Sequence, residues 1–158
     1  MSRAIDPGLD LTISRVIAAP RPAVWEAWAD RARFEQLWVP APAQCRVDAM
    51  ELEPGGGFET RICESDGVFR PHMSGCFLAV DQGERIVFTI CLTGGWRPAE
   101  QPFITAIVTF ADHPDGTKVD AHVMHKNEAD RAMLDEAGFF DGWGAVLAQL
   151  ATLAERNA

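Results

Sequence analysis

Hydrophobic positions near the C-terminal end of the chain repeat with the period of an α-helix. These positions are Trp143, Val146, Leu147, Leu150, Leu153 and Ala154. Their spacing, i, i+3, i+4, i+7 and onward, places all of them on one side of a helix. We therefore predict a long amphipathic helix from about Phe139 to Glu155, with one apolar face that must be buried.

Ahead of this helix, apolar and polar residues alternate with the period of two that is typical of half-buried strands. The predicted strands are Leu9–Ala18, Gln44–Leu52, Gly57–Glu64, Phe69–Val80, Arg85–Leu92, Phe103–Asp112 and Thr117–His125. Turn residues such as Pro54-Gly55, Asp66-Gly67 and Asp115-Gly116 separate them. Because the connections are short, the strands should form an antiparallel meander.

Three shorter helices are predicted between and after the strands. The first covers Ala23 to Ala29, and Asp30 is placed to cap a second that runs through Trp38. Asn127 has the character of a cap for a third, Glu128–Ala137, which Gly138 interrupts. A long amphipathic helix after so many strands must pack on their sheet.

The expected architecture is therefore an α+β helix-grip fold, a curved antiparallel sheet wrapped around the C-terminal helix. The 158 residues fit one domain, 1–158, with a core of about 9–154, and composition changes nowhere in a way that marks a second one. A sheet curved around a helix need not close completely. The space between them can then form a pocket for an apolar small molecule.

The charge and the composition of the chain limit the kinds of partner and the cellular location that we expect. The net charge of −9, from 23 acidic and 14 basic residues, argues against nucleic acid and anionic membranes as partners. No segment approaches the ~20 apolar residues of a membrane span, and the first residues lack a leader pattern, so we expect a cytoplasmic protein. Four isolated cysteines, Cys45, Cys63, Cys76 and Cys91, are expected to be free thiols.

No catalytic or phosphate-binding motif is present, and we expect no cofactor. The histidines are dispersed; His122 and His125 point to opposite faces of one strand, so no metal site is predicted. Alternation places His125 on the inner face at the end of the last strand. It has two interpretations, a structural histidine bonded to backbone or a ligand contact that could act as a general base.

Aromatic residues are the strongest remaining signal for a binding site. The predicted cavity residues are Trp28, Trp38, Phe88, His125, Phe139, Phe140 and Trp143. Adjacent residues on a helix differ by about 100°, so only one of Phe139 and Phe140 can point fully toward the sheet. Trp38 and Trp96 lie where there is less core to fill, and a ligand or dimer contact is an alternative to core packing for both.

Two glycines near the start of the long helix, Gly142 and Gly144, each cost up to about 1 kcal/mol relative to alanine. Something must offset this cost. Either the backbone packs closely there, or the glycines leave open space at the mouth of a pocket.

Several strings along the chain are recognisable together. They are residues 18–28 (AAPRPAVWEAW), Leu37-Trp38, residues 52–56 (LEPGG), residues 84–89 (ERIVFT) and residues 138–144 (GFFDGWG). This order resembles the START-like (SRPBCC) superfamily, in particular the branch named after the homologue of the heat-shock ATPase activator. The resemblance implies the helix-grip fold, and members commonly hold lipids, sterols or polyketides between sheet and helix. Some members are cyclases and some form homodimers. The matching strings are structural, so no catalytic residue is carried over.

Three functions follow as hypotheses. The first is binding of an apolar or amphipathic small molecule between the sheet and the long helix. The second is a cofactor-free, polyketide cyclase-like or hydrolase-like enzyme with His125 as general base, which requires another polar group near that residue. The third is a protein-interaction module related to chaperone regulation, which predicts an exposed apolar patch and a nearly filled interior.

Overall fold

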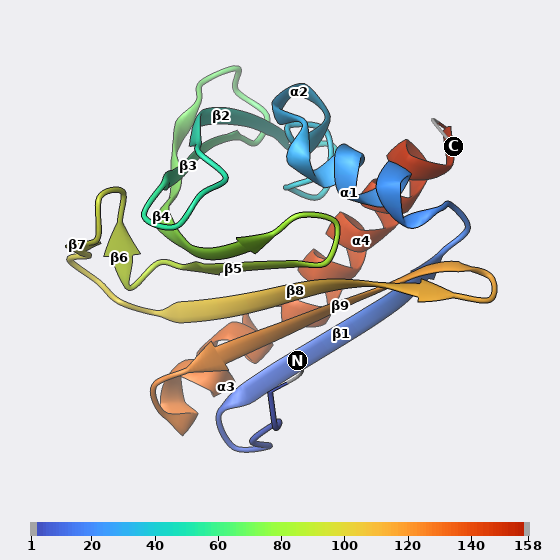
Figure 1. The fold of residues 1–158 in the computed structure, drawn as a ribbon. Coiled ribbons are helices and arrows are strands. Elements are labelled where there is room, and N and C mark those ends of the chain that lie inside the picture. The colour runs from blue at the N-terminus through green and yellow to red at the C-terminus, as the bar shows by residue number, and fades with distance from the viewer. Residues whose placement is uncertain (1–2, 157–158) are drawn as a thin grey trace.

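The computed structural model describes residues 3–156, and its main layer is a seven-stranded antiparallel sheet in the order β1-β9-β8-β5-β4-β3-β2 (Figure 1). The strands of this sheet are β1 (Asp10–Ile17), β2 (Gln44–Met50), β3 (Gly57–Cys63), β4 (Arg70–Asp81), β5 (Arg85–Thr89), β8 (Ile104–His113) and β9 (Gly116–His125). A separate two-stranded ribbon joins β6 (Leu92–Thr93) to β7 (Arg97–Pro98). Strands that follow one another mostly pair, but β1 pairs with β9.

In the described part of the chain, four helices accompany the sheet: α1 (Arg21–Ala29), α2 (Arg31–Phe34), α3 (Glu128–Glu136) and α4 (Phe139–Arg156). In Figure 1 the long α4 runs behind the curved sheet, from α3 at the lower left to the C-terminus at the upper right. It packs against α1 and β1. This arrangement confirms the predicted helix-grip α+β fold.

The helix ends follow the capping residues of the sequence. The Asp30 carboxylate accepts a hydrogen bond from the Arg33 backbone N–H at 2.9 Å and caps α2. The Asn127 side chain accepts one from the Asp130 N–H at 2.8 Å and caps α3. Gly138, with φ of +101°, then separates α3 from α4 in a conformation that favours glycine.

Two predicted elements are wrong at their C-terminal ends. The helix expected to reach Trp38 ends at Phe34, because the chain continues in tighter turns, such as Leu37 N–H to Phe34 O at 3.0 Å, before Pro40. The strand expected over Arg85–Leu92 ends at Thr89, whose hydroxyl accepts a hydrogen bond from the Cys91 N–H at 3.0 Å and so redirects the backbone.

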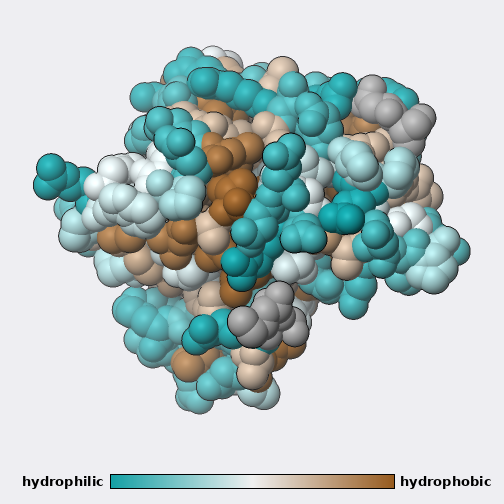
Figure 2. All heavy atoms as spheres, viewed as in Figure 1, coloured by the Kyte–Doolittle hydropathy of each residue, from teal (hydrophilic) through white to brown (hydrophobic). Residues whose placement is uncertain are grey.

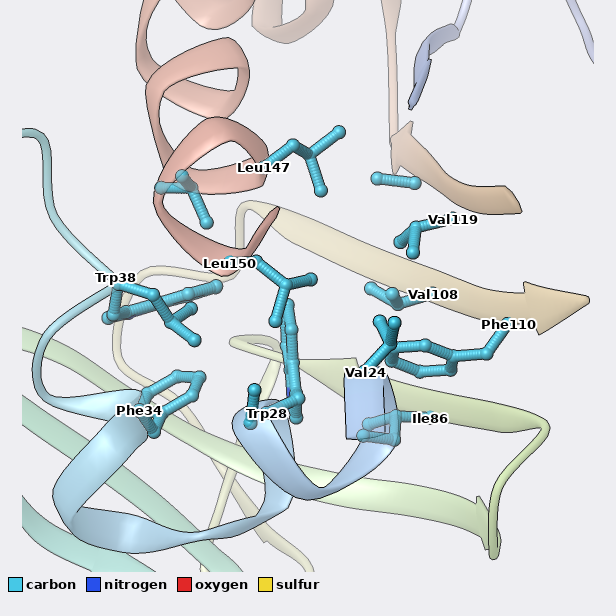
Figure 3. Close-up of a cluster of buried hydrophobic side chains, with 14 of the residues drawn as sticks. Val24, Trp28, Phe34, Trp38, Ile86, Val108, Phe110, Val119, Leu147 and Leu150 are labelled. Carbon is cyan, nitrogen blue, oxygen red and sulfur yellow. The ribbon is translucent and has the colours of Figure 1, made fainter. Parts of the chain in front are cut away.

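The core fills the space between one half of α4, helices α1 and α2, and the sheet. Figure 3 shows Leu150 of α4 reaching toward Trp28, whereas Leu147 lies further along the helix on the side of Val119. Trp28 is fully buried and meets Phe34 edge to face, with ring centroids 5.4 Å apart. Such aromatic pairs add about 0.5–1.5 kcal/mol to the free energy of burial. This end of the molecule is a well-filled interior.

The opposite face of the sheet looks outward. Lys118, Asp120 and His122 of β9 lie on it, as the alternation predicts, although the His122 ring is mostly covered and its Nε2 lies 2.7 Å from an Asp10 carboxylate oxygen. Figure 2 views this face and shows hydrophilic side chains interrupted by hydrophobic patches. The structure thus separates a filled core side from a mixed outer side.

Candidate ligand-binding site

A pocket of about 290 Å³ lies between the sheet and the first turns of α4. It is lined by Trp38, Val39, Pro40, Ile62, His72, Met73, Phe88, Ile90, Phe103, Ile104, Leu134, Gly142, Trp143 and Val146. Strands β3, β4, β5 and β8 supply its floor, while α3, α4 and the segment after α2 supply its walls. Almost every lining side chain is apolar.

Aromatic rings form the stiffest part of this wall. Trp38 meets Trp143 edge to face at 5.6 Å between ring centroids, and it meets Phe88 in the same way at 5.9 Å. Trp38 is held by the core behind it, since it stacks on Phe34 at 5.0 Å. Trp143, the first residue of the apolar stripe of α4, keeps part of its ring exposed. The wall is therefore largely preformed.

Gly142 explains why the pocket stays open at the helix. A Cβ atom added to Gly142 would meet no heavy atom within 4 Å outside its own helix backbone and chain neighbours, whereas one added to Gly144 would contact the Ile13 side chain at 3.8 Å. Of the two reasons considered for these glycines, open space at a pocket therefore applies to Gly142. At Gly144 an added Cβ atom would lie at an ordinary van der Waals distance from its neighbour, so no open space is found there.

The main polar feature of the pocket wall is a histidine bonded to a threonine. His72 Nδ1 lies 3.1 Å from the hydroxyl oxygen of Thr60, a residue that is 2% exposed. The register between β3 and β4 shifts here, since Thr60 faces Met73 and Arg61 faces Pro71. His72 is the extra residue of this bulge, which turns its ring toward the pocket.

The protonation of His72 follows from its surroundings. His72 is an exposed residue, yet partial desolvation of its ring against the apolar wall lowers the pKa of the imidazole below its usual 6.5. Within residues 3–156 the Thr60 hydroxyl has no other hydrogen-bond partner. We therefore assign its proton to the bond with Nδ1, which leaves the proton of the neutral ring on Nε2. His72 then offers one N–H donor.

The predicted cavity residues separate into two groups. Trp38, Phe88 and Trp143 come together in this pocket. Trp28, which was also predicted to line the cavity, does not line this pocket; it is fully buried in the core because α1 packs under α4. Phe139 is 2% exposed and Phe140 is 51% exposed, so only one of the pair points inward, as the helical geometry requires.

His125 is inward-facing and 6% exposed, but it lies outside this pocket. Its Nδ1 donates a hydrogen bond to the Leu9 carbonyl at 2.8 Å, which is the structural interpretation of this residue. No described residue offers a hydrogen-bond partner to its Nε2. The second polar group that a general-base mechanism requires is therefore not found beside it in the described structure.

Sequence reasoning did not identify His72, Met73 or Leu134 as pocket residues. A bulge places both His72 and Met73 at the pocket, and alternation alone cannot place two neighbouring residues there. Leu134 depends on how α3 packs, which has no local signal. Ile90 could have been found, because it continues the inward face of Ile86 and Phe88.

Two further observations concern other kinds of site. A hollow of about 350 Å³ lies on the outer face of the sheet. Its wall mixes apolar side chains such as Ile13 and Ile107 with polar ones, among them His122, which is already paired with Asp10. Among residues 3–156, no group of three or more His, Cys, Asp or Glu side chains is arranged to hold a metal ion. In the same range, no helix has the length and apolar character needed to cross a membrane.

A curved sheet gripping a C-terminal helix over a pocket defines the helix-grip class of the START-like (SRPBCC) superfamily. Within that class, residues 18–155 match the family described as Activator of Hsp90 ATPase homolog 1-like protein, and the chain belongs to that family. No curated protein matches the sequence.

Solved structures of bacterial proteins are similar over nearly the whole chain. A protein of Nitrosomonas europaea is 34% identical with a TM-score of 0.88, and the alignment covers 97% of this chain and 98% of that one. A protein of Mycobacterium smegmatis is 24% identical with a TM-score of 0.76, covering 92% and 90%. The second likeness concerns the fold alone.

Proposed function

We propose that the protein binds a small, largely apolar molecule that carries one hydrogen-bond acceptor, in the pocket between α4 and the sheet. The observation that carries this proposal is a preformed aromatic pocket whose main polar feature is the His72–Thr60 pair. Binding sites for small molecules commonly combine apolar walls with a few placed polar groups. Membership of a superfamily that commonly binds hydrophobic ligands supports it further.

The size of the pocket limits the ligand. At about 290 Å³ it lies at the lower end of the range for small-molecule sites, roughly 300–1,000 Å³. The flat rings of Trp38, Phe88 and Trp143 favour a planar, ring-containing molecule. A carbonyl or phenolic oxygen on that molecule would accept the Nε2–H of His72.

The two alternatives have less support. The enzyme hypothesis needs a second polar group within hydrogen-bond reach of His125, and among the described residues its Nε2 has no hydrogen-bond partner. The interaction module predicts a nearly filled interior, whereas the interior leaves a pocket beside Trp143. Its exposed apolar residues are also spread over the chain: Ile5, Val16, Val68, Trp96, Met133 and Phe140.

The experiment is a thermal-shift screen of the purified protein with planar aromatic ketones, phenols, flavonoids, fatty acids and sterols. A ligand that binds only the native state stabilises it by about 2.7 kcal/mol at a hundredfold excess over its Kd. We expect dose-dependent stabilisation by compact aromatic compounds that carry an oxygen acceptor. A matched variant, His72→Phe, should keep the fold and reduce their shift. No stabilisation across the panel contradicts the proposal.

A further inference from the structure

His125 carries a buried nitrogen that the fold leaves without a partner. The Leu9 carbonyl can only accept a hydrogen bond, so Nδ1 carries a proton, and in this tautomer of imidazole Nε2 presents a lone pair. That atom is inaccessible and unpaired among the described residues. A buried unpaired polar atom costs about 1–3 kcal/mol, so its retention calls for an explanation.

The position of His125 is next to the helix–sheet pocket. Ile104 lines that pocket, and the register of β8 and β9 places Ile104 directly opposite His125. Side chains in such a cross-strand pair lie about 4.5–5.5 Å apart at Cβ. The imidazole is therefore one neighbour beyond the pocket wall, at the end of the sheet beside α3 (Figure 1).

The Phe103 side chain separates the His125 imidazole from the helix–sheet pocket. Its ring meets the His125 ring edge to face at 5.6 Å between centroids. Phe103 lines the helix–sheet pocket, and it also lines a second hollow of about 440 Å³ that reaches His125 from the other side. Phe103 is partly exposed and lies just before β8, outside the strand ladder, where a change of its side-chain rotamer disturbs no ladder hydrogen bond.

We propose that His125 is a second polar subsite of the helix–sheet pocket, closed by Phe103 and used by a hydroxyl group of the bound ligand. When the Phe103 ring turns aside, the pocket continues to the imidazole. A hydroxyl at that end of the ligand donates its proton to Nε2. This inference rests on the proposed function and narrows its ligand class to elongated aromatic molecules with a terminal alcohol or phenol.

The test uses two probes of the same body, 4-hydroxybiphenyl and biphenyl, with protein labelled with ¹⁵N at its histidines. We expect the hydroxylated probe to move the Nε2 resonance of His125 and biphenyl to leave it nearly unchanged. The preference for the hydroxylated probe should fall about tenfold in His125→Phe, which keeps an apolar ring but removes the acceptor.

Phe103→Ala gives a second readout, because it removes the closing ring and should speed association of 4-hydroxybiphenyl. If the probe binds but the Nε2 resonance does not respond, the His125 subsite is overturned while the proposed function stands. If a folded His125→Phe protein still prefers 4-hydroxybiphenyl over biphenyl to the same degree, the His125 subsite is likewise overturned while the proposed function stands. If neither probe binds, both proposals fail. The resonance test needs no variant, so it holds even where His125→Phe does not fold.

Discussion

The two halves of α4 face the same sheet yet create opposite environments. In the C-terminal half, Leu147 and Leu150 are almost completely buried, and Leu150 points toward Trp28 of α1 (Figure 3). In the N-terminal half, Gly142 and the partly exposed Trp143 border an open pocket. One amphipathic stripe therefore produces a filled core and a pocket along a single helix.

The difference arises from what lies beneath each half. Helix α1 fills the space under the C-terminal half with Val24 and Trp28, both fully buried. Among residues 3–156, no helix lies under the N-terminal half, where α3 contributes only Leu134 to the pocket wall. Open space beside a helix thus depends on the neighbouring elements as much as on the apolar stripe itself.

The largest expected effect comes from emptying the filled half. Leu150→Ala removes a fully buried side chain, and we expect the free energy of unfolding to fall by about 2–5 kcal/mol. Urea denaturation measures this loss. Ligand affinity of the folded variant should stay close to that of the parent protein, because Leu150 does not line the pocket. A loss below about 1 kcal/mol would contradict the contrast between the two halves.

A change in the open half should act on binding. Trp143→Ala removes one aromatic wall of the pocket, and we expect 4-hydroxybiphenyl to bind at least about tenfold more weakly by calorimetry, which is about 1.4 kcal/mol. The matched variant Trp143→Phe keeps an apolar ring and should recover most of the affinity. Equal affinity in folded Trp143→Ala would remove Trp143 from the site.

The two glycines offer a finer comparison within the same turn of α4. Gly142→Ala and Gly144→Ala should each raise the free energy of unfolding by up to about 1 kcal/mol, because alanine favours helix. Only Gly142→Ala adds a methyl group at the pocket, so it alone should weaken ligand binding. If both variants bind equally well, Gly142 does not keep the site open for the ligand.

The smallest effect concerns pH. Burial lowers the pKa of His72 in the folded protein below 6.5, so below pH 6.5 the unfolded chain binds more protons there. The contribution of His72 to the free energy of unfolding is fully present above pH 6.5. It decreases as the pH falls toward the lower pKa of the folded protein. We expect the pH dependence of urea unfolding to be shallower in His72→Gln than in the parent protein between pH 5 and 8. Identical slopes would contradict the lowered pKa of His72 in the folded protein.

Periodic elements were predictable, and irregular ones were not. The inward faces of β8 and β9 follow from strict alternation, for example Ala106 and Val108 opposite Val123 and Ala121. The end of β5 depends on one hydrogen bond of the Thr89 hydroxyl, which no periodicity encodes. Long regular segments reveal themselves in sequence because many residues repeat one preference.

The pocket was predictable only in part, for the same reason. Trp143 and Phe88 were found because each continues a regular apolar face. His72 reaches the pocket through a bulge, and Trp28 leaves it because α1 packs more deeply than a rim position allows. The buried face of a helix or strand can be deduced from its own sequence. How deeply a side chain lies in the fold depends on elements that are distant in the sequence.

The pairing of β1 with β9 sets an order of events during synthesis. Residues 10–17 leave the ribosome early, but their partners, residues 116–125, emerge about a hundred positions later. Until then this first strand has no place in the sheet, and pairing between such distant segments is slow to form. The sheet can therefore be completed only after residues 116–125 have been synthesised, about a hundred positions after its first strand.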